Sequence, residues 1–397
     1  MTGIGCEERG QVLRAIRCVF RGRFMAPASR RNRTSGKKAP NIYDVAREAK
    51  VSVFTVSAVI NKKEHVGALL KRRVEAAILK LGYRPNSLAQ SLARERTHTI
   101  GVVVPDISNP FFPMVVRGAE DAAQQKGYSI LLCNSDGIRE KEELCLEVLL
   151  SKRVDGILLT KSQGELSPGI RRMIKDMKIP CVLMMRTDPS LTEDAVITDD
   201  EKGSYEAVSH LARIGYRRIA LVGGPLNISN GKARMRGFRK ALAANNLEYE
   251  PGLVYEGDYR IDSGHRAGIA VLPHRPEAVF VANYLMTVGF LQAAQELGMR
   301  CPEDFGLITL DDYPWLQLFN PPLTAVELPK YEVGRQAADL LIDRLNGNKS
   351  AATSHKITPQ LRVRNSCGFQ LHLKGPVQQH GQDPTSQVVI SKSSQSA

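Results

Sequence analysis

Residues 41–61 carry hydroxyl and amide side chains at helical spacing, together with apolar side chains that could face a partner. Hydroxyl and amide groups bond to phosphate oxygens and to base edges, and small apolar groups contact the thymine methyl, so this chemistry suits the reading of a DNA groove. The candidates for such contacts in and just after this stretch are Tyr43, Ser52, Val53, Phe54, Thr55, Ser57, Ala58, Asn61, His65 and Asn86.

Two short helices joined by a tight turn would position these side chains. The first helix has an apolar face at i, i+3, i+4 and i+7, formed by Ile42, Val45, Ala46 and Ala49. Ser52 is a good N-cap for a second helix that begins at Val53. Within that helix the residues expected to face the first helix are Val56, Val59 and Ile60. This pattern predicts a helix-turn-helix, whose second helix enters the major groove, although any small helical hairpin can share the spacing.

The excess positive charge of the chain is confined to its first quarter. The 397 residues carry a formal net charge of +14, of which +8 lies in residues 1–38 and +6 in residues 39–98, so the remainder is neutral. A basic segment beside a neutral body is the electrostatic pattern of a DNA-binding domain. The alternative is an ordinary solvated run of charges.

Further motifs follow the two helices in order. Residues 71–81 predict a third amphipathic helix. Next come G-Y-R-P-N at 82–86, A-Q-S-L at 89–92, I-G-V-V-V-P-D at 100–106, N-P-F-F at 109–112 and P-P-L-T at 321–324. Together with the D-V-A, V-S, T-V-S and V-I-N pieces of the helix-turn-helix, these motifs resemble the lactose-repressor (LacI/GalR) family of bacterial transcription regulators. The resemblance covers roughly residues 41–369 in collinear order.

The fold expected is α/β. Over residues 98–369 short apolar runs alternate with helical patterns, which predicts βαβ repetition and parallel sheets buried on both faces. Ten strand candidates are too many for one comfortable sheet, so two lobes are expected. The resemblance implies an N-terminal all-α helix-turn-helix head with a hinge helix, joined to a two-lobed periplasmic-binding-protein-like α/β core in which the chain crosses between lobes three times.

The domain boundaries expected are as follows: a disordered basic extension over 1–38, the head over 40–97 with its hinge helix at about 86–95, the core for effector binding and dimerisation over 98–369, and a disordered tail over 370–397. An isolated helix as short as the hinge is marginal in water. In the family two such helices, one from each subunit, enter the minor groove, where the position of Leu92 holds an apolar wedge and Ala89 lies beside the DNA. The alternative is a linker helix that packs Leu92 in a small intramolecular core.

Ligands of such α/β folds bind at the carboxyl ends of strands. The residues that match effector contacts of the family are Phe111, Phe112, Arg234, Tyr259, Asn283 and Asp311, and Trp315 is expected to close the pocket. The simpler alternatives are packing of the phenylalanines at a helix N-terminus, a surface ion pair for Arg234, and a loop cap for Asp311.

The sequence departs from the family pattern at several of these positions. Met185 stands where many members have an aspartate that holds sugar hydroxyls, and Arg186 follows it, which suits an anionic or less hydroxyl-rich ligand. A sugar or sugar derivative therefore remains only the family default. In the recognition helix Ala58 replaces an arginine, which removes a guanine contact worth about 1–3 kcal/mol. Lys50 replaces a turn glycine.

These features predict a DNA-binding transcriptional regulator, most simply a repressor, switched by a small-molecule effector between the lobes. The expected partners are a near-palindromic double-stranded operator and a second copy of the chain, as a homodimer in the cytoplasm near the nucleoid. No cofactor, metal site or enzymatic activity is expected, because no phosphate loop, nucleophile motif or Cys/His metal spacing occurs. No apolar run is long enough to span a membrane. The alternative function is a solute-binding protein of a transport system.

Overall fold

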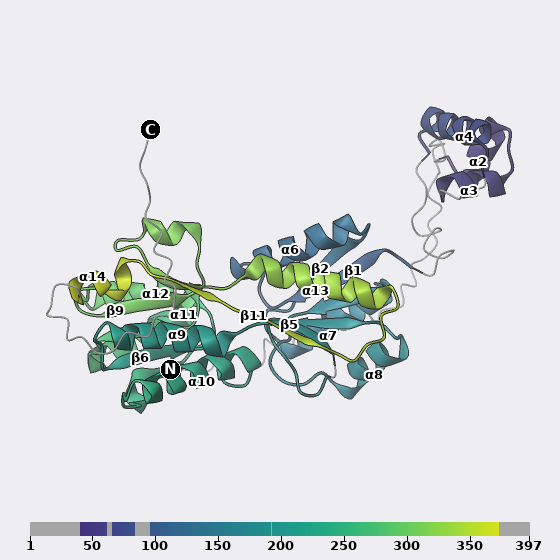
Figure 1. Ribbon diagram of the computed structural model, residues 1–397. Helices are drawn as coiled ribbons and strands as arrows, with labels where there is room; N and C mark the ends of the chain where they lie inside the picture. Colours follow the sequence, from purple (N-terminus) through teal and green to yellow (C-terminus); the bar gives the residue numbers. More distant parts are fainter. Residues whose placement is uncertain (1–39, 62–65, 84–95, 192, 373–397) are drawn as a thin grey trace, which may run out of the picture. The chain divides into compact units, whose positions relative to one another are not determined.

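The computed structural model describes residues 40–61, 66–83, 96–191 and 193–372. The expected N-terminal extension, the hinge helix, nearly all of the tail, and the candidates His65, Asn86, Ala89 and Leu92 lie outside these residues. The chain divides into two compact units, with the boundary between Asn86 and Ser87. We call them the head and the two-lobed unit, and describe each by itself (Figure 1).

The head is a three-helix unit. Its helices are α2 (Ile42–Ala49), α3 (Val53–Ile60) and α4 (Ala68–Leu81). Asn41 caps α2 by accepting from the backbone N–H groups of Tyr43 and Asp44, while Asp44 accepts from the N–H of Asn41. Ser52 caps α3 through the N–H of Thr55, 3.1 Å away. Both caps satisfy N–H groups that a helix cannot satisfy itself. The predicted start of α3 at Val53 is confirmed, whereas α4 begins three residues before the predicted 71.

An apolar cluster fixes the packing of the three head helices. Its buried members are Val45, Ala46, Ala49, Val56, Val59, Val74 and Ala77. The turn between α2 and α3 places Lys50 in the left-handed region, with φ 52° and ψ 50°. A side chain there costs about 1–2 kcal/mol relative to glycine. The guanidinium of Arg73, on α4, donates to the Lys50 carbonyl oxygen and so holds the turn against the third helix.

The two-lobed unit contains two six-stranded sheets, one in each lobe. The strands of the first lobe are β1 (Thr99–Val104), β2 (Ser129–Asn134), β3 (Gly156–Leu159), β4 (Cys181–Met184), β5 (Asp194–Thr198) and β11 (Ser354–Ile357), in the order β11-β5-β4-β3-β1-β2. The strands of the second lobe are β6 (Ile219–Gly223), β7 (Val254–Glu256), β8 (Ala278–Val281), β9 (Gly306–Leu310), β10 (Thr324–Glu327) and β12 (Gln360–Arg362), in the order β12-β10-β9-β8-β6-β7.

Helices cover both faces of each sheet. Those of the first lobe are α6 (Phe111–Gln125), α7 (Arg139–Ser151), α8 (Pro168–Asp176) and α13 (Lys330–Leu345), and those of the second are α9 (Asp200–Arg213), α10 (Ser229–Ala244), α11 (Ile261–Val271) and α12 (Tyr284–Glu296). The helix α14 (Phe369–His372) and the short 3-10 turns η1 (Pro251–Leu253), η2 (Leu272–His274), η3 (Pro314–Leu318) and η4 (Asn365–Cys367) complete the described elements. Figure 1 shows α6 and α13 side by side on one face of the first sheet, with α7 and α8 on the other.

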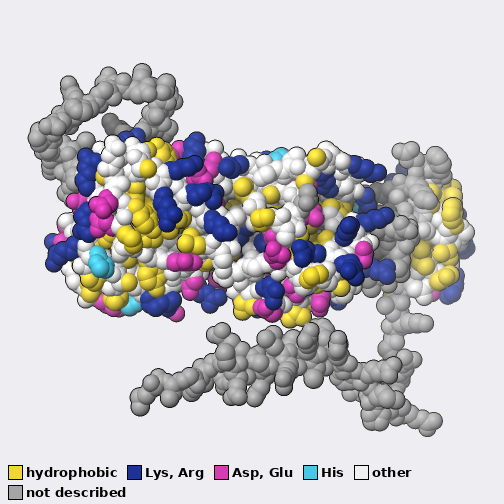
Figure 2. Space-filling model, turned by 90° about the horizontal axis from the view of Figure 1, so that it is seen from below, with side chains coloured by type: hydrophobic (Ala, Val, Ile, Leu, Met, Phe, Trp, Pro, Cys, Tyr) yellow, Lys and Arg dark blue, Asp and Glu magenta, His cyan; other side chains and the backbone are white. Residues whose placement is uncertain are grey.

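The chain passes between the lobes three times, as the resemblance implied. The crossings lie between β5 and α9, between β10 and α13, and between β11 and β12. One apolar cluster also continues from lobe to lobe, because it contains residues of β1 and α6 together with residues of α9, α10 and β6. On the face seen in Figure 2, basic and acidic side chains are interspersed over this unit, in keeping with its neutral sequence. None of the helices described is long and apolar enough to cross a membrane.

Two strands escape prediction from the sequence. β11 and β12 are short edge strands whose side chains are exposed or only partly buried, so they show no apolar pattern. β12 pairs with β10 in antiparallel orientation, which corrects the expectation of purely parallel sheets. An edge strand needs neither two buried faces nor a crossover helix, so both features are compatible with the polar sequence.

The two longest helices of the first lobe's outer layer, α6 and α13, touch at their backbones. A Cβ atom on Gly334 of α13 would lie 1.8 Å from the carbonyl oxygen of Val115 on α6. Gly334→Ala should therefore force the helices apart and lower the free energy of unfolding of the two-lobed unit by about 3 kcal/mol, as urea denaturation would measure. Gly169→Ala is the matched control, since its Cβ would meet no atom nearer than 3.9 Å. Equal midpoints for the two variants would contradict this close packing.

Candidate functional site

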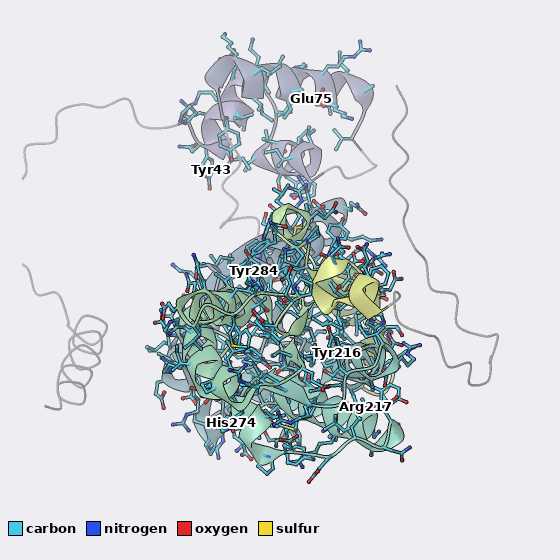
Figure 3. The ribbon with its side chains drawn as sticks, turned by 90° about the vertical axis from the view of Figure 1, so that its left-hand side faces the viewer. Tyr43, Glu75, Tyr216, Arg217, His274 and Tyr284 are labelled. Carbon is cyan, nitrogen blue, oxygen red and sulfur yellow. The ribbon has the colours of Figure 1, made fainter. Side chains whose placement is uncertain are left out.

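The head presents a surface suited to DNA on α3 and the start of α2. Phe54 leaves 75% of its side chain exposed, and Tyr43 leaves 65% exposed. Figure 3 shows Tyr43 projecting from the head. Thr55, Ser57 and Asn61 are partly exposed on the same helix or at its end, and the Asn61 amide donates to the Ser57 hydroxyl at 3.2 Å. Ser52 is exposed, but its hydroxyl already caps α3.

Two predicted DNA contacts point inward instead. Ala58 is 6% exposed, so it cannot touch a thymine methyl in this arrangement. Val53 is partly buried and packs against the apolar cluster of the head. The reason is that α3 is almost wholly apolar and only eight residues long, so its buried stripe is wider than the spacing of Val56 and Val59 indicates.

A cavity of about 370 Å³ opens between the two lobes. The first lobe contributes Pro105, Asp106, Asn109, Phe111, Phe112, Asp136, Gly137, Ile138, Gln163, Met185 and Arg186, and the second contributes Pro225, Ile228, Asn230, Arg234, Asp258, Tyr259, Arg260, Asn283 and Asp311. Most of these residues follow a strand directly or begin the next helix, which is where parallel sheets bind ligands. Seven of the eight effector candidates from the sequence therefore line one cavity.

Four of the lining residues have a left-handed backbone although none is glycine, and one of them is Asp136, which follows β2 with φ 53°. Met185 follows β4 with φ 64°, Tyr259 lies shortly after β7 with φ 69°, and Asp311 follows β9 with φ 88°. Each conformation costs of order 1–3 kcal/mol and persists only where the surrounding structure enforces it. All four of these residues line the cavity.

Arg234 is held by a buried ion pair. Its Nε and Nη2 atoms each lie 2.7 Å from Oδ1 of Asp200, and Nη1 donates to the Ala282 carbonyl oxygen at 2.6 Å. Burial alone lowers the pKa of the Arg234 guanidinium, but the Asp200 charge outweighs burial and the pKa lies above its usual value. The alternative of a surface ion pair is thus wrong in its location only, since the pair is buried in the cavity wall.

Asp311 offers an acceptor to the cavity. The carboxylate is 4% exposed, and its Oδ1 lies 3.6 Å from Nζ of Lys330, which is too far for a hydrogen bond. The Lys330 ammonium donates instead to the carbonyl oxygen of Asp312 at 2.9 Å and lies over the ring of Tyr313, 4.4 Å from its centroid. Burial raises the pKa of Asp311 above its usual value. A ligand hydroxyl would satisfy this oxygen.

Tyr259 and Asn283 form a small assembly at the back of the cavity. The Asn283 side chain caps α12 through the N–H of Met286 at 2.9 Å and donates to the Tyr259 carbonyl oxygen at 3.0 Å, so it positions Tyr259. The Tyr259 ring lies beside Arg234, whose Cζ is 5.3 Å from the ring centroid. Gly224 makes room for the ring, because a Cβ there would lie 2.1 Å from the tyrosine Cζ and hydroxyl oxygen.

Several buried polar atoms of the cavity wall have no hydrogen-bond partner in the described structure. They are Nε of Arg186, Oδ1 of Asn230, the hydroxyl of Tyr259 and Oδ1 of Asp311. An unpartnered buried polar atom costs about 1–3 kcal/mol. Four of them on one cavity indicate a ligand that carries both donors and acceptors. The edge-to-face rings of Phe111 and Phe112, with centroids 5.2 Å apart, supply an apolar side.

Trp315 does not line the cavity, which corrects the prediction that it closes the pocket. Its ring stacks on Tyr313 with centroids 4.7 Å apart and planes 7° apart, and Tyr284 meets it edge to face. The stack holds the tryptophan in η3, where 40% of it remains exposed.

Sequence reasoning missed several polar lining residues. Asp106, Asp136, Gln163 and Asp258 each stand two to four residues after the end of a strand. That shared position is a signal in the sequence, because the carboxyl ends of parallel strands meet at one edge. Asn230 begins a helix rather than ending a strand, and no local pattern distinguishes it.

Comparison with known protein families agrees with this architecture. A domain described as "Bacterial regulatory proteins, lacI family" matches residues 41–86, and a "Periplasmic binding protein-like domain" matches residues 208–367. The HTH-type transcriptional repressor PurR of Aliivibrio fischeri is 35% identical over 330 residues, which cover 82% of this chain and 97% of that protein.

The chain belongs to the LacI family of bacterial regulatory proteins. The ribose operon repressor of Escherichia coli is 36% identical to this LacI-family regulator over 81% of the chain and 98% of the repressor. Among solved structures, the Lac repressor dimer bound to operator and the anti-inducer ONPF is 28% identical, with a TM-score of 0.74 over 83% of the chain and 99% of that structure's chain. A family whose domain model includes the head favours a regulator over the transport protein considered above.

The buried ion pair of this LacI-family regulator predicts a large asymmetry between two arginines of one helix. Arg234→Met leaves Asp200 buried without a partner and should lower the free energy of unfolding of the two-lobed unit by about 3–5 kcal/mol. Arg236→Met removes an exposed pair with Glu201 and should cost about 1 kcal/mol or less. Urea denaturation of both variants measures the difference, and equal small losses would show that Arg234 does not brace the lobe.

Proposed function

We propose that this LacI-family regulator represses transcription by binding an operator through α3 of two copies, and that a small polar molecule in the cavity changes its operator affinity. One observation carries the proposal: a single chain joins a helix-turn-helix that exposes Phe54 and Thr55 to a cavity with four unpartnered polar atoms. DNA and effector each require a separate surface, and the two units supply them.

The operator part of the proposal draws on the relatives. PurR and the ribose operon repressor are named as repressors, and the Lac repressor structure is a dimer on operator DNA. A helix-turn-helix reads one half-site, so a dimer matches a near-palindromic site. The chain acts in this proposal by binding alone, without catalysis, in the cytoplasm where the DNA lies.

The domain organisation proposed keeps the head at about 40–97, with its hinge at about 86–95, and the effector and dimerisation core at 98–369. The effector contacts proposed are Phe111, Phe112, Arg186, Arg234, Tyr259 and Asp311, with Asn283 as a positioning residue. Closure of the lobes around a ligand is the differential interaction that a switch requires. Hydrogen bonds already join the lobes near the cavity, among them those from Asn227 to Gln163, from Arg260 to the Asp136 carbonyl, and from the Thr187 N–H to Ser229.

Selection of binding sites from a random DNA pool with the full chain tests the operator proposal. We expect a near-palindromic site, two protected half-sites in a footprint, and at least a roughly tenfold weaker Kd for Phe54→Ala on that site, with little change on random DNA. Glu75→Ala is the control, because Glu75 is exposed on α4 and carries no expected base contact. Failure to enrich any sequence, or protection of a single half-site, would contradict the proposal.

The effector proposal has its own test. A pool of small metabolites that shifts operator affinity of the parent chain should shift that of Asp311→Asn at least about tenfold less, because the change removes the acceptor charge in the cavity. Operator affinity without metabolites should stay within about twofold, since Asp311 lies outside the head. If the Asp311→Asn variant responded to the metabolites as strongly as the parent chain does, the effector would bind elsewhere.

A further inference from the structure

Arg186 is a buried cation of the cavity wall without a carboxylate partner among residues 96–191 and 193–372 or in the described head. It is 8% exposed, its Nη1 donates to the Lys161 carbonyl oxygen at 2.7 Å, and its Nε has no partner. Arginine stays charged in proteins. A buried charge that lacks a counter-ion is costly, so this guanidinium calls for an anion.

The nearest charged groups cannot supply that anion. Glu142 pairs with Lys161 at 2.9 Å, and Asp200 pairs with Arg234 at 2.7 Å, all four side chains being buried. This cluster therefore holds three cations and two carboxylates. Burial lowers the pKa of the Arg186 guanidinium, and the charge of Arg234 lowers it further. The uncompensated positive charge lies on the side chain that faces the cavity.

The N-terminus of α10 adds to the same positive region. This helix of 16 residues has Ile228 at its N-cap, no side-chain cap and no acidic residue in its first turn. Ile228 and Asn230 line the cavity, and the N–H of Thr187, next to Arg186, donates to the Ser229 hydroxyl at 2.9 Å. The first N–H groups of a helix lack internal partners and carry a partial positive charge, which favours an anion.

The rest of the cavity favours hydroxyl groups. Asp311 and the hydroxyl of Tyr259 have unpartnered atoms on the second lobe. Rim carboxylates also line the opening, where Asp106 accepts from Ser108 and Asp258 lies 3.8 Å from Arg266. These acidic groups would repel an anion and accept hydroxyl donors, so the two kinds of surface would orient a ligand that carries both.

We infer that the effector is a small polyhydroxylated molecule with one anionic oxygen group, a carboxylate or a phosphate, and that this group binds Arg186 and the N-terminus of α10. The inference rests on the proposed function in taking the cavity as the effector site. It narrows the ligand class from small polar molecules in general to sugar acids or sugar phosphates.

Thermal unfolding of the full chain with inorganic phosphate tests the subsite, with potassium chloride at equal ionic strength as reference. At 20 mM phosphate we expect the midpoint of the two-lobed unit to rise by about 2–4 °C, as linkage gives for millimolar binding. Arg186→Met should abolish the rise, and Arg236→Met, an exposed arginine outside the cavity lining, should keep it. No rise in the parent chain, or an undiminished rise in Arg186→Met, overturns the inference.

Three further probes identify the anionic group. If D-gluconate raises the midpoint more than D-glucose at equal concentration, and Arg186→Met loses this difference, the anionic group is a carboxylate. If D-glucose 6-phosphate gives that result instead, the group is a phosphate. Glucose matching both overturns the inference. Arg186→Lys retains the charge without the planar fork and should keep a reduced rise with phosphate, so it tests the subsite even if Arg186→Met fails to fold. Operator selection distinguishes a failure of this inference from a failure of the proposed function. A chain that binds phosphate through Arg186 but enriches no DNA sequence would contradict only the proposed function.

Discussion

The ion pair between Arg234 and Asp200 lies at the point where the chain first passes from one lobe to the other. Asp200 is the first residue of α9, and its second carboxylate oxygen accepts from the Thr198 hydroxyl at the end of β5, 3.0 Å away. A single buried carboxylate thus joins the last strand of one lobe to an arginine that lines the cavity. The second crossing repeats the arrangement, since Lys330 begins α13 and lies 3.6 Å from Asp311. A ligand that binds Arg234 or Asp311 would act directly on the segments that connect the two lobes.

Much of this architecture could be predicted from local pattern. Apolar runs gave the positions of ten strands because parallel strands are buried on both faces, and residues placed just after those strands, such as Asp311 and Tyr259, do line the cavity. The pattern failed where the position of a side chain depends on contact with a residue that is distant in the sequence. Asp200 lies 34 residues from Arg234 in the sequence, and Trp315 packs edge to face against Tyr284, which lies 31 residues before it, instead of lining the cavity. Neither relation leaves a trace in spacing along the chain.

The short recognition helix shows the opposite limit. Eight residues, nearly all apolar, cannot be divided into a core face and a DNA face by periodicity alone, and Ala58 and Val53 join the inner side. The side of α3 that faces solvent therefore consists of Phe54 and the partly exposed Thr55 and Ser57, and only the three-dimensional structure identifies it. The capping side chains Asn41 and Ser52 fix where the helices begin, so they set the register of that outer face without belonging to the apolar pattern.

The burial of the ion pairs near the lobe crossings has a consequence for the effect of salt. Pairs such as Arg234–Asp200 are shielded from counter-ions, whereas the basic head would displace them from DNA phosphates. Ionic strength therefore weakens DNA binding by the head more than it weakens these buried pairs. A rise in the salt concentration of the cell would lower the affinity for DNA, while the buried ion pairs near the lobe crossings kept their strength. DNA binding would then respond to the ionic strength of the solution, and effector binding would respond mainly to the concentration of the effector.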